Sequence, residues 1–233
     1  MNKVTKIIIE LLLAVGICGL VYLLYSNIMK PVNFNKEKAN RQAVAVQRLK
    51  DIRTLQVAYK SVTGKFNSSV DSLKQFYENG KMEIVMQIGS MDDSLAVINT
   101  EAIKKANKKL KPEQLTAKLE EAYKNGQKVV YSKSTEIPVR DTLFNNRPDF
   151  NIDSLKYIPF SGKEPIQMEA TTKMVSGVPV PLFEARIPWK SLLKGMNNQL
   201  RINLDAESRD LNRYEGLQVG SISAPNNNAG NWE

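Results

Sequence analysis

Ser191 and Lys194 are the residues of this chain best spaced for covalent chemistry. Their Ser-x-x-Lys spacing puts a lysine one helical turn after a serine, where its amine could activate the hydroxyl as a nucleophile. The Lys-Thr-Gly and Ser-Asp-Asn elements that accompany this spacing in serine/lysine hydrolases do not occur in the sequence, and the run from Ser161 to Lys163 does not replace them. We therefore expect no catalytic residue, and a Ser/Lys hydrolase is the least favoured functional hypothesis.

The sequence is poor in the residues on which metal and thiol chemistry depends. It has no histidine and a single cysteine, Cys18, which excludes thiol–imidazole pairs, histidine metal sites and an intrachain disulfide. The adjacent carboxylates Asp92 and Asp93 could bind a divalent cation, but a solvated loop is the favoured interpretation. Walker, dinucleotide-binding and CxxC motifs do not occur. We expect neither a cofactor nor a metal.

Glu10 is a further candidate, because it lies within an apolar run. A carboxylate near the interior of a membrane is costly, so it usually has a partner or faces water. The favoured interpretation is an ion pair with Lys6, four residues earlier on a helix, at the cytoplasmic interface. A contact with a neighbouring subunit and the transfer of a proton remain as alternatives.

The run that follows Glu10 predicts a membrane-spanning helix. Residues 11–29 carry no charge and are followed by Lys30 and Pro31. At about 1.5 Å per residue they extend roughly 28 Å, close to the thickness of about 30 Å of a hydrocarbon core. Tyr22 and Tyr25 lie near the far end, where aromatic rings favour the membrane interface.

Two processed forms of this segment are less favoured. A cleaved signal peptide would need a small-x-small site after the run, and the residues that follow it offer none. A lipoprotein would have a small residue before the lipidated cysteine, whereas Ile17 precedes Cys18. An uncleaved anchor is therefore expected.

The predicted span has features beyond those that an anchor needs. Gly16 and Gly19 lie three residues apart on one face, and Glu10 lies within a few turns of them. Small residues let helix backbones approach closely in lipid, so we expect Glu10, Gly16 and Gly19 to form an assembly surface within the membrane. The alternative is that glycine is simply frequent in membrane helices.

Basic residues and tail length disagree about the orientation of this span. Lys3 and Lys6 precede it, but more basic residues follow it, and the charge rule then favours a cytoplasmic soluble part. A short N-terminal tail is instead typical of an uncleaved signal anchor, and large C-terminal domains translocate largely regardless of charge.

The first part of the chain, to about residue 75, resembles the type IV pilins and pseudopilins. Glu10 stands where pilins keep a glutamate early in the apolar run, and Thr5 and Lys6 stand where they have the glycine of the processing site. A second matching stretch has the pseudopilin pattern of a helix that ends at a glycine, a following aromatic residue and a Ser-x-Asp-x-Leu helix start. Its residues are Leu55, Tyr59, Gly64, Phe66, Ser69, Asp71 and Leu73.

The whole chain also resembles an uncharacterised family of single-pass envelope proteins of the Bacteroidota. The segments RDTLF, IDSLKYIPF and NNNAGNWE carry this likeness. Both resemblances imply anchoring in the inner membrane, with the N-terminus in the cytoplasm and residues 31–233 in the periplasm.

The expected fold class is α+β: a transmembrane helix continuing into a helical stalk, then a helical insert and an antiparallel β-sheet. We divide the chain into a tail and membrane helix (1–30), a pilin-like stalk (31–80) and an α+β domain (81–233) with the insert at 101–125. Asn35 is the expected N-cap of the stalk helix, which should run to about residue 62.

One face of the stalk helix carries apolar residues at helical spacing. We expect this face to pack on the protein's own domain, with a coiled-coil seam as the alternative. Its residues are Ile52, Leu55, Tyr59 and Val62.

The remaining elements follow from turn and strand signals. A short helix should run from Ser68 or Ser69 to Tyr77, another from Trp189 to Met196, and two helices should meet at Lys111-Pro112. Strands are expected at 82–90, 128–139, 165–175, 178–187, 202–206 and 216–222, with Ser176-Gly177 as a hairpin turn. The last ten residues should be irregular.

These features favour a non-catalytic scaffold or accessory subunit of a cell-envelope complex, such as a pilin-like secretion system or a Ton/Tol-type motor. Its expected partners are other inner-membrane or periplasmic proteins and membrane lipids, without nucleic acid. The net charge is +9, and the basic stretch at 31–69 could contact anionic head groups. The alternative is a periplasmic module that binds peptidoglycan or acidic glycans. The oligomeric state is not predicted.

Overall fold

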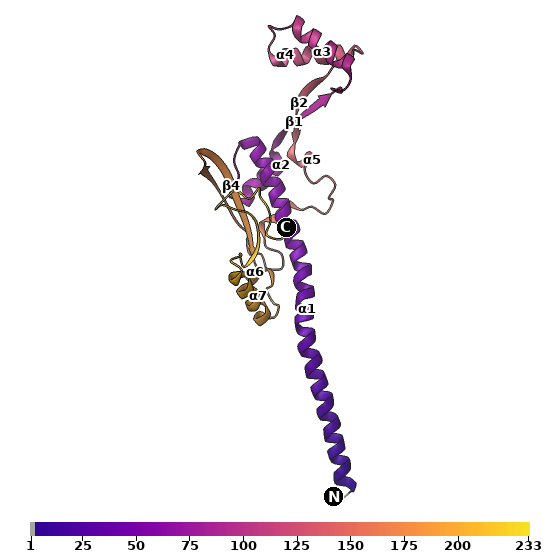
Figure 1. Ribbon diagram of the computed structural model, residues 1–233, viewed down its shortest axis with the longest axis vertical. Coiled ribbons are helices and arrows are strands. Elements are labelled where there is room, and N and C mark those ends of the chain that lie inside the picture. Colours follow the sequence, from indigo (N-terminus) through magenta and orange to yellow (C-terminus); the bar gives the residue numbers. More distant parts are fainter. Residues whose placement is uncertain (1–2) are drawn as a thin grey trace. The chain divides into compact units, whose positions relative to one another are not determined.

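The computed structural model describes the backbone of residues 3–233 and, within the first helix, the side chains of Ile7 and of residue 9 onward. The fold is α+β, as expected, with a long N-terminal helix, further helices and two small antiparallel sheets (Figure 1). The chain divides into two compact units. Unit 1 comprises the chain up to Leu73 together with Asn151–Glu233, and unit 2 comprises Lys74–Phe150.

Helix α1 (Lys3–Thr63) is a single helix that runs from the apolar segment into the body of unit 1 (Figure 1). The expectation that a separate stalk helix begins at Asn35 is wrong, because Asn35 lies in the middle of α1. Pro31 is also inside the helix. A proline there removes one backbone hydrogen bond and crowds the preceding turn, but packing of the flanking turns can maintain the helix. Phe34, one turn later, is buried.

The sheet of unit 1 has three antiparallel strands in the order β3 (Gln167–Val175), β4 (Val178–Pro188) and β5 (Gly216–Gly220). The hairpin between β3 and β4 turns at Ser176 and Gly177, as predicted, and Val175 pairs with Val178. Both turn residues have positive φ, 50° and 82°. That conformation matches the right-handed twist of the two strands.

The core of unit 1 forms where α1 packs against β4 and β5. On the helix, the fully buried residues recur at steps of three and four, and on β4 they are two apart, as expected for one inward face of each element. The fully buried members are Ala45, Leu49, Ile52 and Leu55 of α1, Phe183, Ala185 and Ile187 of β4, and Val219 of β5.

Three short helices complete unit 1: η1 (Ile152–Lys156), α6 (Trp189–Leu192) and α7 (Asn198–Asp210). The strand predicted at 202–206 is wrong, because these residues form the middle of α7. The Asn197 side chain accepts a hydrogen bond from the Leu200 amide and starts the helix. An ion pair between Arg201 and Asp205, four residues apart, stabilises it further.

The last ten residues contain no helix or regular strand, as expected, but they are attached to β5. The Gly220 amide donates to the Ala229 carbonyl, and the Asn231 amide donates to the Gln218 carbonyl. The Asn231 side chain donates to the Gly216 carbonyl. An isolated bridge between Val219 and Gly230 adds to this edge of the sheet.

Unit 2 contains most of α2 (Val70–Asn79), then β1 (Lys81–Ile88), α3 (Ser94–Ala106), α4 (Pro112–Lys124), β2 (Tyr131–Pro138) and α5 (Val139–Thr142). Strands β1 and β2 form an antiparallel pair. The insert begins earlier than predicted, because Asp93 caps α3 by accepting from two backbone amides. Leu119, Val129 and Tyr131 form its small core, against which Leu115 packs.

Replacing Leu49 by alanine tests the packing of α1 against the sheet of unit 1. We expect a loss of about 2–5 kcal/mol in the free energy of unfolding, because the side chain is fully buried and leaves a cavity. Val57→Ala is the matched control on an exposed face of the same helix and should change stability by less than about 0.5 kcal/mol. Urea unfolding of both variants, followed by tryptophan fluorescence, makes the comparison. Equal effects would contradict the packing described here.

Candidate functional site

The candidate functional site is α1 together with the residues that hold it in unit 1. From Ile9 onward, α1 contains a segment that is long and apolar enough to cross a membrane, and none of this segment is buried within the protein. Tyr22 and Tyr25 are exposed near its end. Glu10 is also exposed, whereas the side chain of its expected partner Lys6 lies outside the described residues.

A shallow apolar groove runs along the membrane-suited part of α1. Beside Gly16 there is open space, because outside the helix's own backbone and the adjacent residues no atom lies within 4 Å of the position that a Cβ would take. The groove is lined by Ile9, Leu12, Leu13, Gly16, Ile17 and Leu20. Gly19 is similarly open but does not line the groove, and neither does Glu10. Of the three predicted assembly residues, Gly16 is therefore the one that lines this groove.

Arg41 attaches the middle of α1 to the end of α6. Its guanidinium donates to the carbonyl oxygens of Leu192 and Lys194, at 3.2 and 3.0 Å. It also pairs with Glu37 at 2.8 Å and lies 4.9 Å from the centre of the Phe160 ring. Because carbonyls at a helix end lack partners within the helix, a guanidinium is well suited to bind them.

Arg48 forms the second attachment, two turns further along α1. Its guanidinium donates to the carbonyl of Tyr157. Burial lowers the pKa of Arg48, and the nearby Asp51 carboxylate opposes that shift. Asp51 is itself buried and accepts a hydrogen bond from Gln47 at 2.9 Å. Asp51 is therefore inside the protein, and Arg48 is half-buried beside it.

Arg53 forms the third attachment and binds the C-terminal residue. It donates to the side chain of Glu233 at 2.7 Å and to the carbonyl of Asn228 at 3.3 Å. The hydrogen bond from Arg53 lowers the pKa of Glu233. Three arginines of the basic stretch at 31–69 thus bind the protein's own body.

The end of α1 is fixed by an amide. Gln56 is fully buried, and its side chain donates to the carbonyl of Asn67 at 2.6 Å and accepts from the amide of the same residue at 3.0 Å. The loop that follows the helix is therefore attached to the helix itself.

The predicted contact face of the stalk lies mostly inside unit 1. Ile52 and Leu55 are fully buried, Tyr59 is half-buried, and Val62 is 49% exposed. The first two residues pack within the protein, as the favoured interpretation expected, and they are not available for a coiled-coil seam.

Ser191 and Lys194 come together around Glu164 and not as a serine–lysine pair. The Lys194 ammonium binds the Glu164 carboxylate and the Ser161 carbonyl, each at 2.9 Å. A hydrogen bond from Ser191 and then one from Lys194 lower the pKa of Glu164. This arrangement joins α6 to the loop around residue 162, and the lysine binds a carboxylate and a carbonyl oxygen.

Asp92 and Asp93 make hydrogen bonds and an ion pair within unit 2. Asp93 caps α3 and binds the Lys128 ammonium at 2.9 Å, and the hydrogen bond from Lys128 lowers its pKa. The Asp92 amide is bonded to the Ser90 hydroxyl. Within the part of the chain that the structure describes, no group of three histidine, cysteine, aspartate or glutamate residues could hold a metal ion.

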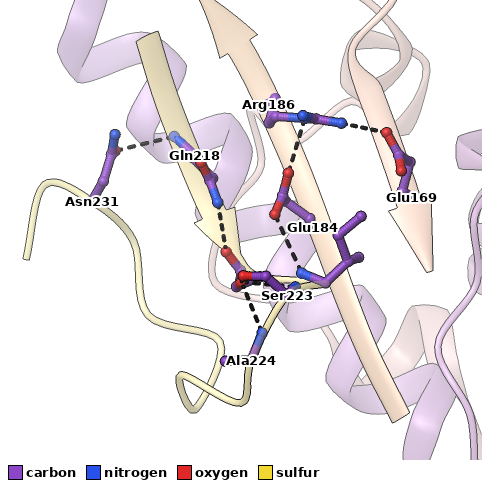
Figure 2. A network of polar contacts seen from close by, with 10 residues as sticks. Glu169, Glu184, Arg186, Gln218, Ser223, Ala224 and Asn231 are labelled. Atoms are coloured by element: carbon purple, nitrogen blue, oxygen red, sulfur yellow. Dashed lines mark hydrogen bonds and ion pairs between the residues drawn. The ribbon is translucent and has the colours of Figure 1, made fainter. Parts of the chain in front are cut away.

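A polar network on the sheet was not anticipated from the sequence. Glu184 is only 6% exposed and accepts from Arg186 at 3.0 Å and from the Ile222 amide at 3.3 Å. Arg186 lies between Glu184 and Glu169 (Figure 2) and binds both. The sequence contains a signal for this network. Glu184 and Arg186 are two apart on one strand and so share a face, and the hairpin register pairs Glu184 with Glu169.

Comparison of the chain with protein-family models, with curated proteins and with solved structures finds no match in any of the three. The function is therefore argued from the geometry of the protein itself.

The Glu164 cluster predicts a dependence of stability on pH. The pKa of Glu164 is lower in the folded protein than its ordinary value of 4.5, so its ionisation stabilises the fold above pH 4.5. This contribution is lost as the pH falls through the lowered value. We expect Glu164→Gln to lower the unfolding temperature slightly at pH 7 and to have less effect at pH 3.

Asp210→Asn is the control, because it removes an exposed carboxylate of unit 1 for which the described residues show no ion pair. It should leave the pH profile of the wild-type protein unchanged. Thermal unfolding followed by circular dichroism at both pH values tests this. A Glu164→Gln effect of the same size at pH 3 and pH 7 would show that the carboxylate charge is not involved.

Proposed function

We propose that this protein is a non-catalytic scaffold subunit of a cell-envelope complex, anchored in the inner membrane by α1. The observation that carries the proposal is the continuity of α1. One helix supplies both the segment suited to a bilayer and the buried face on which the sheet of unit 1 packs.

Such continuity matters because it leaves no flexible linker between anchor and body. A linker of flexible residues would let a tethered domain move over a wide volume. Here the helix is attached to its own unit by Arg41, Arg48 and Arg53 and by the apolar core between them. A partner that moves or holds the membrane segment would thereby move or hold unit 1, which is the property expected of a scaffold or a coupling subunit.

The proposal also covers location and partners. We place unit 1 and unit 2 in the periplasm on the strength of the pilin-like N-terminal segment, although the balance of basic residues around the span favours the opposite side. Other inner-membrane proteins are the proposed partners, in a pilin-like secretion assembly or a Ton/Tol-type motor. The groove at Gly16 is the proposed contact surface within the bilayer.

Filling the groove tests the contact within the membrane. We expect Gly16→Leu to insert normally and to lose most of the membrane proteins that co-purify with the wild-type chain in mild detergent, because the added side chain keeps a partner helix at a distance. Val21→Leu is the control, since Val21 does not line the groove. Quantitative mass spectrometry of the purified samples measures the difference. Full retention of every partner by Gly16→Leu would leave the span as an anchor only.

Cysteine labelling tests the orientation. Cys18 is the single cysteine of the chain and lies in the proposed span, so a cysteine introduced at Lys65 gives one exposed thiol in unit 1. We expect Lys65→Cys to react with a membrane-impermeant maleimide in intact spheroplasts, while the wild-type chain does not. Reaction only after lysis would place unit 1 in the cytoplasm.

A further inference from the structure

Helix α3 of unit 2 is apolar on two opposite sides. One side faces the interior of unit 2, where Ala96 and Thr100 are buried and Ile103 packs against the small core. The other side carries Leu95 and Ile98, each of which is 60% exposed. A surface helix usually has polar residues on its outer side. The outer side of α3 is therefore an apolar surface that the rest of the described chain leaves uncovered.

This outer face extends along the helix. Leu95, Ile98 and Ala102 are spaced by three and four residues, so they lie along one side of α3, and all three are exposed. Met91, just before the helix, is 66% exposed. We call Leu95, Ile98 and Ala102 the outer face of α3.

The outer face leads to a strongly basic turn between α3 and α4, at one end of unit 2 (Figure 1). Residues 102–112 contain five lysines and no acidic residue, and all five lysines are exposed. We call them the lysine tip: Lys104, Lys105, Lys108, Lys109 and Lys111.

Few carboxylates balance the lysine tip. Glu101 pairs with Lys105 at 3.7 Å, and Asp93 is bound by Lys128 at 2.9 Å. Among the described residues of segment 91–111, Asp92 is then the carboxylate that has no ion pair, whereas four lysines of the tip have none. The segment therefore presents apolar side chains together with an excess of free positive charge.

The composition of this segment selects the kind of partner. Residues 91–111 contain no aromatic residue and no arginine. Aromatic residues and arginine dominate protein–protein contacts, where lysine is depleted, and stacked aromatic residues carry the binding of single-stranded nucleic acids. Aliphatic side chains beside lysines instead suit a bilayer, because the apolar groups enter the interface while the long lysine side chains reach the head groups.

We propose that the outer face of α3 and the lysine tip bind the surface of an anionic lipid bilayer. Leu95 and Ile98 enter the boundary between head groups and acyl chains, and the lysines bind the lipid phosphates. The inference rests on the proposed function, since α1 is what holds the chain near lipid. It adds a second membrane contact, in unit 2, that an anchored scaffold does not require.

Vesicle flotation tests the contact in the full chain. The protein is assembled into nanodiscs of phosphatidylcholine, so that α1 occupies a neutral bilayer. The nanodiscs are mixed at physiological salt with vesicles of phosphatidylcholine, with or without phosphatidylglycerol. We expect the loaded nanodiscs to float with the anionic vesicles and not with the neutral ones, and empty nanodiscs to float with neither.

Neutralising the lysine tip tests the electrostatic part of the contact. The variant changes four lysines to glutamine: Lys104, Lys108, Lys109 and Lys111. Since a basic residue near an anionic surface contributes about fivefold in affinity, we expect a loss of about a hundredfold or more. The control removes the same charge from exposed positions of unit 1 and should bind nearly as the wild-type chain does. It changes four lysines to glutamine: Lys65, Lys163, Lys173 and Lys190.

An environment-sensitive fluorophore tests whether the outer face enters the bilayer. The label is attached to Ile98→Cys in a chain whose own cysteine is removed by Cys18→Ser. We expect its emission to rise and shift to shorter wavelength when anionic vesicles are added. The same label on Lys65→Cys, at an exposed position of unit 1, should not respond.

Several results would overturn the inference. They are the absence of flotation with anionic vesicles, wild-type affinity in a folded lysine-tip variant, and an unchanged emission at position 98 when vesicles are bound. Binding of polyglutamate without binding of vesicles would indicate an acidic protein surface instead. Circular dichroism establishes folding, and if the lysine-tip variant does not fold, the label at position 98 decides.

Failure of the proposed anchor gives a different result. A chain that does not enter nanodiscs contradicts anchoring by α1. The anionic vesicles are then added to the chain without nanodiscs, and the lysine-tip variant and the label at position 98 still decide whether α3 binds lipid.

Discussion

The burial of one face of α1 against β4 and β5 is the contact on which the rest of unit 1 depends. Ala45, Leu49 and Ile52 are fully buried there, and each fully buried aliphatic side chain of the size of leucine contributes about 1.5–3 kcal/mol. Around this apolar strip of α1 (Ala45, Leu49 and Ile52), side chains of the helix donate hydrogen bonds to oxygen atoms elsewhere in unit 1. Arginine side chains from the helix bind the end of α6, the Tyr157 carbonyl and the C-terminal residue. Without the apolar strip these groups would have no fixed surface to bind.

Much of the fold follows from local signals in the sequence. Ser176-Gly177 predicts the β3–β4 hairpin, because a tight turn between twisted strands needs residues that accept positive φ. The break at Lys111-Pro112 predicts the start of α4, since proline is well suited to a first helical turn. The apolar face at Ile52 and Leu55 predicts burial through its helical spacing. In each case the residues that decide the structure are close together in the chain.

The predictions that are wrong share another cause. The composition of residues 202–206 permits a strand, whereas the Asn197 cap and the Arg201–Asp205 ion pair stabilise a helix there. Asn35 has the chemistry of an N-cap, but a helix that is already formed passes through it. The arginine attachments are not predicted from the sequence at all. They join residues far apart in sequence, and a basic residue on a helix has the same local pattern whether it faces solvent or a carbonyl.

The division of unit 1 into two distant stretches of chain has a consequence for biosynthesis. Arg41 binds carbonyls more than 150 residues later, and Arg53 binds Glu233, 180 residues later. A ribosome makes the chain from the N-terminus, so the apolar strip of α1 emerges long before β4, β5 and the tail that cover it. Closing such a long loop is entropically costly and slows folding. During synthesis, the strip around Leu49 therefore remains uncovered, and in this interval the chain is most exposed to aggregation.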